Sequence, residues 1–83
     1  MEIKINIPDY NGVLQSNWED GFEIKTIFSN EEIVISANKA GLISLAKQLL
    51  TLAQDTVPTG CHFHFDEFNS LEENSKELII QKL

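Results

Sequence analysis

The chain contains no arginine: all six of its basic residues are lysines, against thirteen Asp and Glu, for a net charge of -7. Binding to nucleic acid needs clustered cations against the phosphates, and arginine is the usual reader of guanine edges. The composition therefore excludes a nucleic acid as the expected partner. An acidic chain is more readily steered towards a basic protein.

Cysteine is almost absent as well, since Cys61 is the only one and no intramolecular disulfide can form. The first residues show neither the basic region nor the apolar core of a secretory signal, so we expect a cytoplasmic protein. Long apolar runs are also missing, because the most apolar stretch, 41–53, is interrupted by polar residues. The sequence thus predicts no contact with membranes.

A length of 83 residues, with 42% hydrophobic residues and dispersed charge, predicts one folded domain spanning 1–83. Residues 2–7 alternate polar and apolar side chains, which predicts a half-buried strand that directs Ile3, Ile5 and Ile7 inward. Residues 9–21 are rich in turn formers. Residues 22–28 and 33–37 then predict a hairpin.

Between residues 39 and 54 the apolar period changes from two to about 3.6, which predicts a helix. Ser36 or Asn38 is positioned to cap its start, and Pro58 with Gly60 prevents its continuation. On a helical wheel the apolar half comprises Leu42, Ile43, Leu45, Ala46, Leu49, Leu50, Leu52 and Ala53. We expect this half to pack across a sheet.

Two further strands are predicted at residues 62–66 and 77–82. Ser70 and Glu73 have the spacing of a capping box, so one helical turn is expected between these strands, ending at Asn74. The predicted fold class is α+β, with a mainly antiparallel five-stranded sheet in the order βββαββ and one long amphipathic helix packed on one face.

The run 61–66, Cys-His-Phe-His-Phe-Asp, alternates strictly and so sorts its side chains to two faces of a strand. Phe63 and Phe65 are expected in the core, with His62, His64 and Asp66 on the opposite face. A His-x-His pair can bind one metal ion. Because the pattern is weak and few further ligands are available, a metal-binding domain or small metalloenzyme is kept only as an alternative function. Cys61 and His62 point to opposite faces and cannot act as nucleophile and base.

Acidic doublets carry most of the negative charge, and either they serve solubility or they mark a docking surface. Trp18 directly precedes one doublet. An exposed tryptophan there would be a second anchor for a partner, although a tryptophan buried in the core is the more common case. We expect partner binding through these doublets, the exposed sheet face and this tryptophan. The residues are Trp18, Glu19, Asp20, His62, His64, Asp66, Glu67, Glu72 and Glu73.

The second half of the chain resembles a small bacterial family, Immunity protein 32. The similarity lies in the helix segments 41–46 and 49–53, the H-x-H-x-D run within 60–67, and the segments 69–72 and 75–80. The resemblance implies a cytoplasmic, non-enzymatic protein that binds and neutralises a cognate toxin domain delivered by neighbouring cells. It transfers no catalytic residue and no cofactor.

Three hypotheses follow for the function. The leading one is an immunity protein that inhibits a toxin, such as a basic nuclease, through acidic loops and an exposed sheet face. The second is the metal-binding domain on His62, His64 and Asp66. The third is a homodimeric adaptor that uses the exposed sheet face without any toxin.

Overall fold

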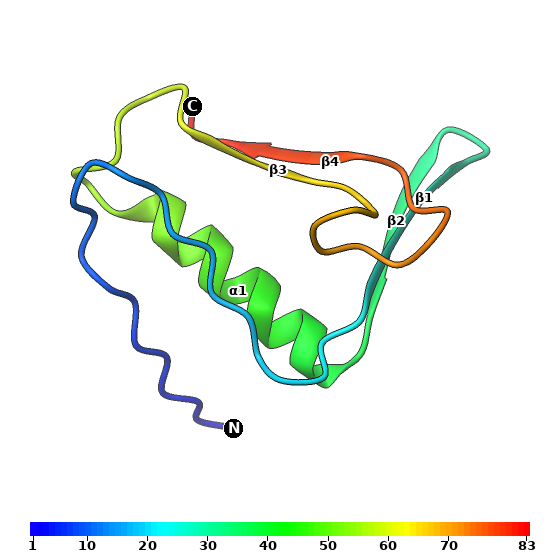
Figure 1. The fold of residues 1–83 in the computed structure, drawn as a ribbon, viewed down its shortest axis with the longest axis horizontal. Helices are drawn as coiled ribbons and strands as arrows, with labels where there is room; N and C mark the ends of the chain where they lie inside the picture. The colour runs from blue at the N-terminus through cyan, green and yellow to red at the C-terminus, as the bar shows by residue number, and fades with distance from the viewer.

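Two small antiparallel sheets and one helix make up the fold of residues 1–83, which the computed structural model describes in full. Figure 1 shows the helix α1 (Lys39–Ala53) running beneath one sheet, while the other sheet projects from one end of the helix. The α+β class is confirmed. The single five-stranded sheet is wrong, because four strands form two separate pairs.

The projecting sheet is the predicted hairpin, formed by β1 (Ile24–Ser29) and β2 (Glu32–Ala37). Its register runs from Ile24 opposite Ala37 to Ser29 opposite Glu32. The two turn residues, Asn30 and Glu31, have φ of 52° and 63°. Positive φ at both central positions is the geometry that matches the twist of two-residue hairpins, and asparagine tolerates it well.

The second sheet pairs β3 (His62–Phe65) with β4 (Leu78–Gln81), which confirms the last two predicted strands. The alternation predicted for β3 is observed, since Phe63 and Phe65 are 7% and 4% exposed while both histidines are exposed. The two phenylalanine rings stack with centroids 5.5 Å apart. They lie in the main core cluster with Ile24, Leu52, Val57 and Leu71.

Residues 2–7 do not form the predicted strand, and none of residues 1–18 makes a backbone hydrogen bond to another backbone group. Alternation gives strand propensity, but a strand also needs a partner. The Gln54 side chain accepts from the Tyr10 N–H at 3.0 Å and donates to the Pro8 carbonyl, and these bonds hold the segment beside the end of α1. Ile3 is exposed, and Ile5 and Ile7 are half-buried.

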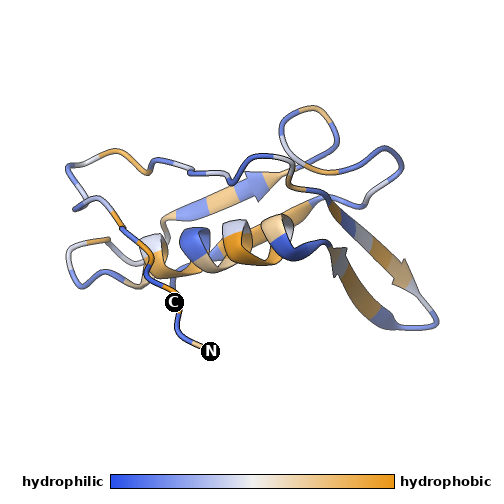
Figure 2. Ribbon diagram, turned by 90° about the horizontal axis from the view of Figure 1, so that it is seen from below, coloured by the Kyte–Doolittle hydropathy of each residue, from blue (hydrophilic) through white to orange (hydrophobic).

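The helix has nearly its predicted span, and Asn38 caps it by accepting from the Gly41 N–H at 2.8 Å. The side of the helix that faces the core differs from the prediction, although Leu52 is buried and Leu45 packs against the core as expected. Ser44, Gln48 and Thr51 are buried, whereas Leu42, Leu49 and Leu50 are 56%, 51% and 47% exposed. Figure 2 accordingly shows hydrophobic colour on the outer side of the helix.

Hydrogen bonds to the preceding segment explain why the polar side of α1 is buried. The Gln48 side chain accepts from the Asn17 N–H at 3.1 Å and donates to the Asn17 carbonyl, while Ser44 Oγ accepts from the Glu19 N–H at 2.8 Å. We call these bonds, together with those of Gln54, the polar clasp. Buried polar groups are tolerated when each finds a partner, and no buried side-chain nitrogen or oxygen here lacks one.

The capping-box turn between the second pair of strands is also wrong, because residues 70–73 form irregular turns. Ser70 Oγ donates to Asn69 Oδ1 at 2.6 Å instead of capping a helix. The carbonyl of Asp66 accepts from the N–H groups of Asn69, Ser70 and Leu71 and so folds the segment back on itself. Asn74 has φ of 68°, and the chain reverses there.

Candidate functional site

The segment between β3 and β4, which we call the acidic loop, spans residues 66–77. It carries five carboxylates and a single lysine: Asp66, Glu67, Glu72, Glu73, Glu77 and Lys76. Four of the predicted partner-binding residues, Asp66, Glu67, Glu72 and Glu73, thus come from one loop. The loop is the most strongly charged part of the surface.

Contacts with β1 hold the acidic loop in place. The N–H groups of Glu72 and Lys76 donate to the carbonyls of Ile24 and Thr26 at 2.8 and 2.9 Å, along the edge of β1 that β2 leaves free. Ser75 Oγ accepts from the Thr26 N–H at 3.2 Å, and Leu71 is only 5% exposed in the core. The loop is therefore anchored at its second half by backbone pairing and by an apolar side chain.

Phe68 stands out from this anchored loop with 90% of its surface exposed. It lines a shallow depression together with Glu67 and Glu73, so an aromatic ring is flanked by two carboxylates. The Phe68 N–H donates to Asp66 Oδ1 at 2.9 Å, and Glu67 Oε2 accepts from the Asn74 N–H at 2.9 Å. These bonds orient the backbone beneath the ring.

Sequence reasoning missed Phe68. Its only signal is that it departs from the alternation that places Phe63 and Phe65 in the core, since it lies three residues after Phe65 in a polar stretch. Aromatic side chains that are exposed among charged residues are frequent anchors of protein interfaces. The ring and its carboxylates form the centre of the candidate site.

The other predicted acidic pair lies elsewhere, at the beginning of α1. The Glu19 carboxylate lies 3.2 Å from Lys47 Nζ, and Asp20 is exposed beside Lys39 in a depression that Glu19 also lines. Lys47 thus pairs with Glu19, and Lys39 lies in the same depression as Asp20. Their local field is weaker than that of the acidic loop.

Trp18 is half-buried rather than projecting into solvent. Its ring stacks on Phe22 at 4.6 Å and meets the edge of Phe65 at 5.3 Å. Such aromatic pairs stabilise a core by about 0.5–1.5 kcal/mol each beyond the area they bury. In this arrangement Trp18 is a packing residue at the border of the core.

The outer face of the second sheet places His64 near carboxylates, while His62 lies apart from them. His64 Nε2 is 3.4 Å from Glu77 Oε2, and one ligand atom from each of His64, Asp66 and Glu77 lies within 4.8 Å of the others. His62 is not in this group, and its Nδ1 is 3.3 Å from the Gly60 carbonyl. The pairing of Phe65 with Leu78 brings Asp66 and Glu77 together at the sheet end.

One imidazole and two carboxylates are a donor set that Zn²⁺ accepts, with water completing a tetrahedral shell. Glu77 replaces His62 in the predicted trio, because strand register rather than the H-x-H spacing brings the ligands together. All three groups are at least partly exposed. An exposed imidazole and carboxylate pair contributes at most about 1 kcal/mol to stability, so it has little structural weight.

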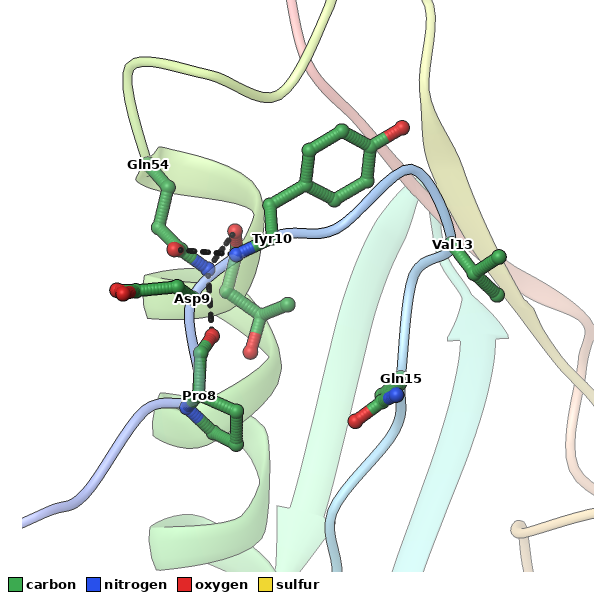
Figure 3. Close-up of a pocket in the computed structure, with 7 residues that line it drawn as sticks. Pro8, Asp9, Tyr10, Val13, Gln15 and Gln54 are labelled. Carbon is green, nitrogen blue, oxygen red and sulfur yellow. Dashed lines mark hydrogen bonds between the residues drawn. The ribbon is translucent and has the colours of Figure 1, made fainter.

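Pro8, Asp9, Tyr10, Val13, Gln15, Thr51 and Gln54 line a small cavity between the amino-terminal segment and α1. Figure 3 shows Gln54 bridging the backbone of Pro8 and Tyr10 at this place. The cavity measures about 10 Å³, roughly the space of one water molecule. It is part of the polar clasp and is too small for a ligand.

Together, the fold and this site define a small α+β domain that presents an acidic surface with an aromatic centre from an anchored loop. Residues 32–83 match the model of the family Immunity protein 32, and the chain belongs to that family. No curated protein and no solved structure shows significant similarity to it. The fifteen-residue α1 lacks the length and apolar character that a membrane-spanning helix requires.

Membership in an immunity protein family points to a toxin-neutralising role and to a toxin as the partner. Such proteins generally act without catalysis. The matched residues include β2, α1 and the whole acidic loop, so the candidate site lies within the part of the chain that the family shares.

Proposed function

We propose that this chain neutralises a cognate bacterial toxin domain in the cytoplasm by forming a stoichiometric complex with it. The observation that carries the proposal is the anchored acidic loop, which holds the 90% exposed Phe68 between Glu67 and Glu73. A preformed aromatic anchor loses little conformational entropy on binding. Complex formation needs no reacting group on this chain.

Charge supports a basic partner. The chain has a net charge of -7, and the acidic loop contributes five carboxylates with one lysine. Complementary fields raise association rates and discourage wrong partners, so a toxin with a basic active surface, such as a nuclease, suits this loop. Covering that surface would keep the toxin from its substrate.

The neighbouring face of the second sheet extends the proposed contact surface. His64 lies opposite Ile79 and His62 lies opposite Gln81, and Ile79 is 56% exposed. This face continues from Asp66 at the end of β3. It supplies the apolar and polar rim that an interface needs around a central anchor.

Co-expression with the toxin encoded beside this gene tests the proposal. The chain should rescue growth and purify as a stable complex with the toxin domain. Phe68→Ala should weaken binding by about thirtyfold, as for a typical central anchor. The double charge reversal Glu67→Lys and Glu73→Lys should reduce the association rate most strongly at low salt.

Asp55→Lys is the control, because this exposed carboxylate is the second residue after α1, and the carboxyl end of α1 lies at the opposite end of the molecule from the acidic loop (Figure 1). Glu67→Lys and Glu73→Lys are also measured singly, because Asp55→Lys makes the same change in net charge as each of them. Asp55→Lys should leave binding nearly unchanged. If the complex forms but all variants bind as the wild type does, the acidic loop is not the contact surface. If neither rescue nor a complex is seen, the toxin-neutralising role is refuted.

Metal binding is the second candidate, favoured by the approach of His64, Asp66 and Glu77. Calorimetric titration with Zn²⁺ alone distinguishes it from the first. Binding at micromolar metal that is lost in His64→Ala and Glu77→Gln, but kept in His62→Ala, would support this site. The absence of any binding heat at these concentrations would remove it.

A further inference from the structure

We propose that two copies of this chain associate through the free edge of β2, in antiparallel fashion, to form a four-stranded sheet in the order β1-β2-β2-β1. The inference does not depend on the toxin, and it concerns a different surface from the acidic loop. It rests on the hydrogen-bonding state of the hairpin, the exposed apolar side chains on it, and the distribution of charge along β2.

The two edges of the hairpin differ. The outer edge of β1 is paired, since the carbonyls of Ile24 and Thr26 accept from the acidic loop. No hydrogen bond joins β2 to any segment other than β1. An unpaired strand edge is a template for another strand.

The register identifies which β2 groups face outward. In an antiparallel pair, residues alternate between bonding across the pair and bonding away from it. Thr26 bonds away from β2, and its partner across the hairpin is Ile35. The N–H and C=O groups of Ile35, and of Ile33 two residues before it, therefore point to the free edge.

Several apolar side chains of the hairpin are exposed, and Figure 2 shows hydrophobic segments along both strands of the projecting arm. The exposed fractions are 40% for Ile27, 58% for Phe28, 74% for Ile33, 42% for Val34 and 42% for Ile35. Strand edges that remain single are commonly protected by lysine, proline or a bulge. Residues 32–37 contain neither lysine nor proline, and the register has no bulge.

The exposed apolar area of the hairpin is large enough to contribute to a reversible contact between two copies. A large side chain has an accessible area on the order of 150–200 Å² when it is fully exposed, so these fractions leave roughly 400–500 Å² of the hairpin uncovered. The backbone of β2 extends it towards the ~800 Å² that each partner contributes to a standard interface. A centre without charged residues is typical of homodimers.

Charge along β2 favours a second copy in antiparallel orientation. Glu31 and Glu32 stand at its beginning, and Lys39 follows its end. If Ile35 pairs with Ile35 of the second copy on a twofold axis, the end of β2 that follows Glu31 in each copy lies beside the end that precedes Lys39 in the other. A parallel arrangement would instead place the four glutamates together, so the antiparallel one is favoured.

Sedimentation of the purified chain from about 1 to 200 µM tests the proposal. The wild type should change from monomer to dimer within this range, and Ile35→Lys should remain monomeric. Ile79→Lys is the matched control: it introduces the same charge on the other sheet, at a position 56% exposed, and should dimerise as the wild type does. Far-UV circular dichroism shows whether each variant is folded.

A charge swap and amide hydrogen exchange test the register of the paired β2 strands. They also test the proposal if Ile35→Lys does not fold. Glu31→Lys should raise the dimer dissociation constant about fivefold, and adding Lys39→Glu should restore it. The amides of Ile33 and Ile35 should exchange more slowly as concentration rises. A monomer at 200 µM would overturn the proposal, as would a dimer in which these two amides stay unprotected or the charge swap has no effect.

Discussion

Two separate substitutions on α1, one of a buried polar residue and one of an exposed apolar residue, test the orientation of the helix. Gln48 is fully buried, whereas its neighbour Leu49 is 51% exposed. The helical wheel places Leu49 in the core and Gln48 in solvent, and the structure places them the other way round. The variants Gln48→Leu and Leu49→Gln therefore have opposite expected effects under the two orientations.

The magnitude follows from the bonds of the Gln48 side chain. Its amide accepts from the Asn17 N–H and donates to the Asn17 carbonyl. Each such bond contributes a net ~1 kcal/mol, and leucine has a similar volume, so little cavity is created. Gln48→Leu should lower the free energy of unfolding by about 2 kcal/mol, and Leu49→Gln should change it by about 0.5 kcal/mol or less.

Urea unfolding followed by circular dichroism measures both values, and thermal unfolding provides a second reading. For a domain of this size, 2 kcal/mol corresponds to a decrease in Tm of roughly 8–16 °C. Dilute protein, at about 1 µM, keeps self-association from contributing. A larger loss in Leu49→Gln than in Gln48→Leu would refute the observed orientation of α1 and, with it, the polar clasp.

Two other residues at the start of α1 give further predictions. Gly41→Ala should destabilise the fold by about 1–2 kcal/mol in the same urea assay, because the added Cβ would clash with the Glu23 backbone carbonyl. This loss would outweigh the helix propensity of alanine, which normally favours it over glycine by about 1 kcal/mol. Ala53→Gly on the exposed side is the control, and a stabilised Gly41→Ala would contradict this close approach. Asn38→Ala should cost about 2 kcal/mol, at the upper end for a helix cap, since this side chain also accepts from the Glu23 N–H at 3.0 Å and donates to the Gly21 carbonyl at 2.9 Å. A decrease in the free energy of unfolding below about 0.5 kcal/mol would show that the hydrogen bonds from Asn38 to the residues preceding β1 contribute little to stability.

Elements whose pairing is local could be predicted from the sequence. The hairpin needs only two alternating runs and a short turn, and α1 is a long segment with clear periodicity, so both appear close to their expected bounds. The core positions of Phe63 and Phe65 follow from the same local alternation. The strand predicted at residues 2–7 failed because its partner had to come from elsewhere in the chain, and alternation carries no information about a partner.

The site was predictable in composition but not in arrangement. Charged doublets showed where carboxylates occur, yet only the anchoring of the acidic loop on β1 places Glu67 and Glu73 around Phe68. The same applies to Glu77, which meets His64 through the register of β3 and β4 across the loop. Long-range pairing of this kind leaves no periodic signal in a single sequence.

The orientation of α1, which leaves Leu42, Leu49 and Leu50 exposed, limits the stability of the chain. Only six hydrophobic residues are buried, while leucines of the helix and the isoleucines of the hairpin remain exposed. Apolar burial is the main favourable term in folding, so a monomer that leaves this area in water and relies on a polar clasp has a small margin of stability. Binding of a toxin or of a second copy stabilises the folded state by mass action, in proportion to the logarithm of its concentration over its Kd. The unfolding temperature of this chain should therefore rise with its own concentration if β2 pairs as proposed, and rise again when the toxin domain is added.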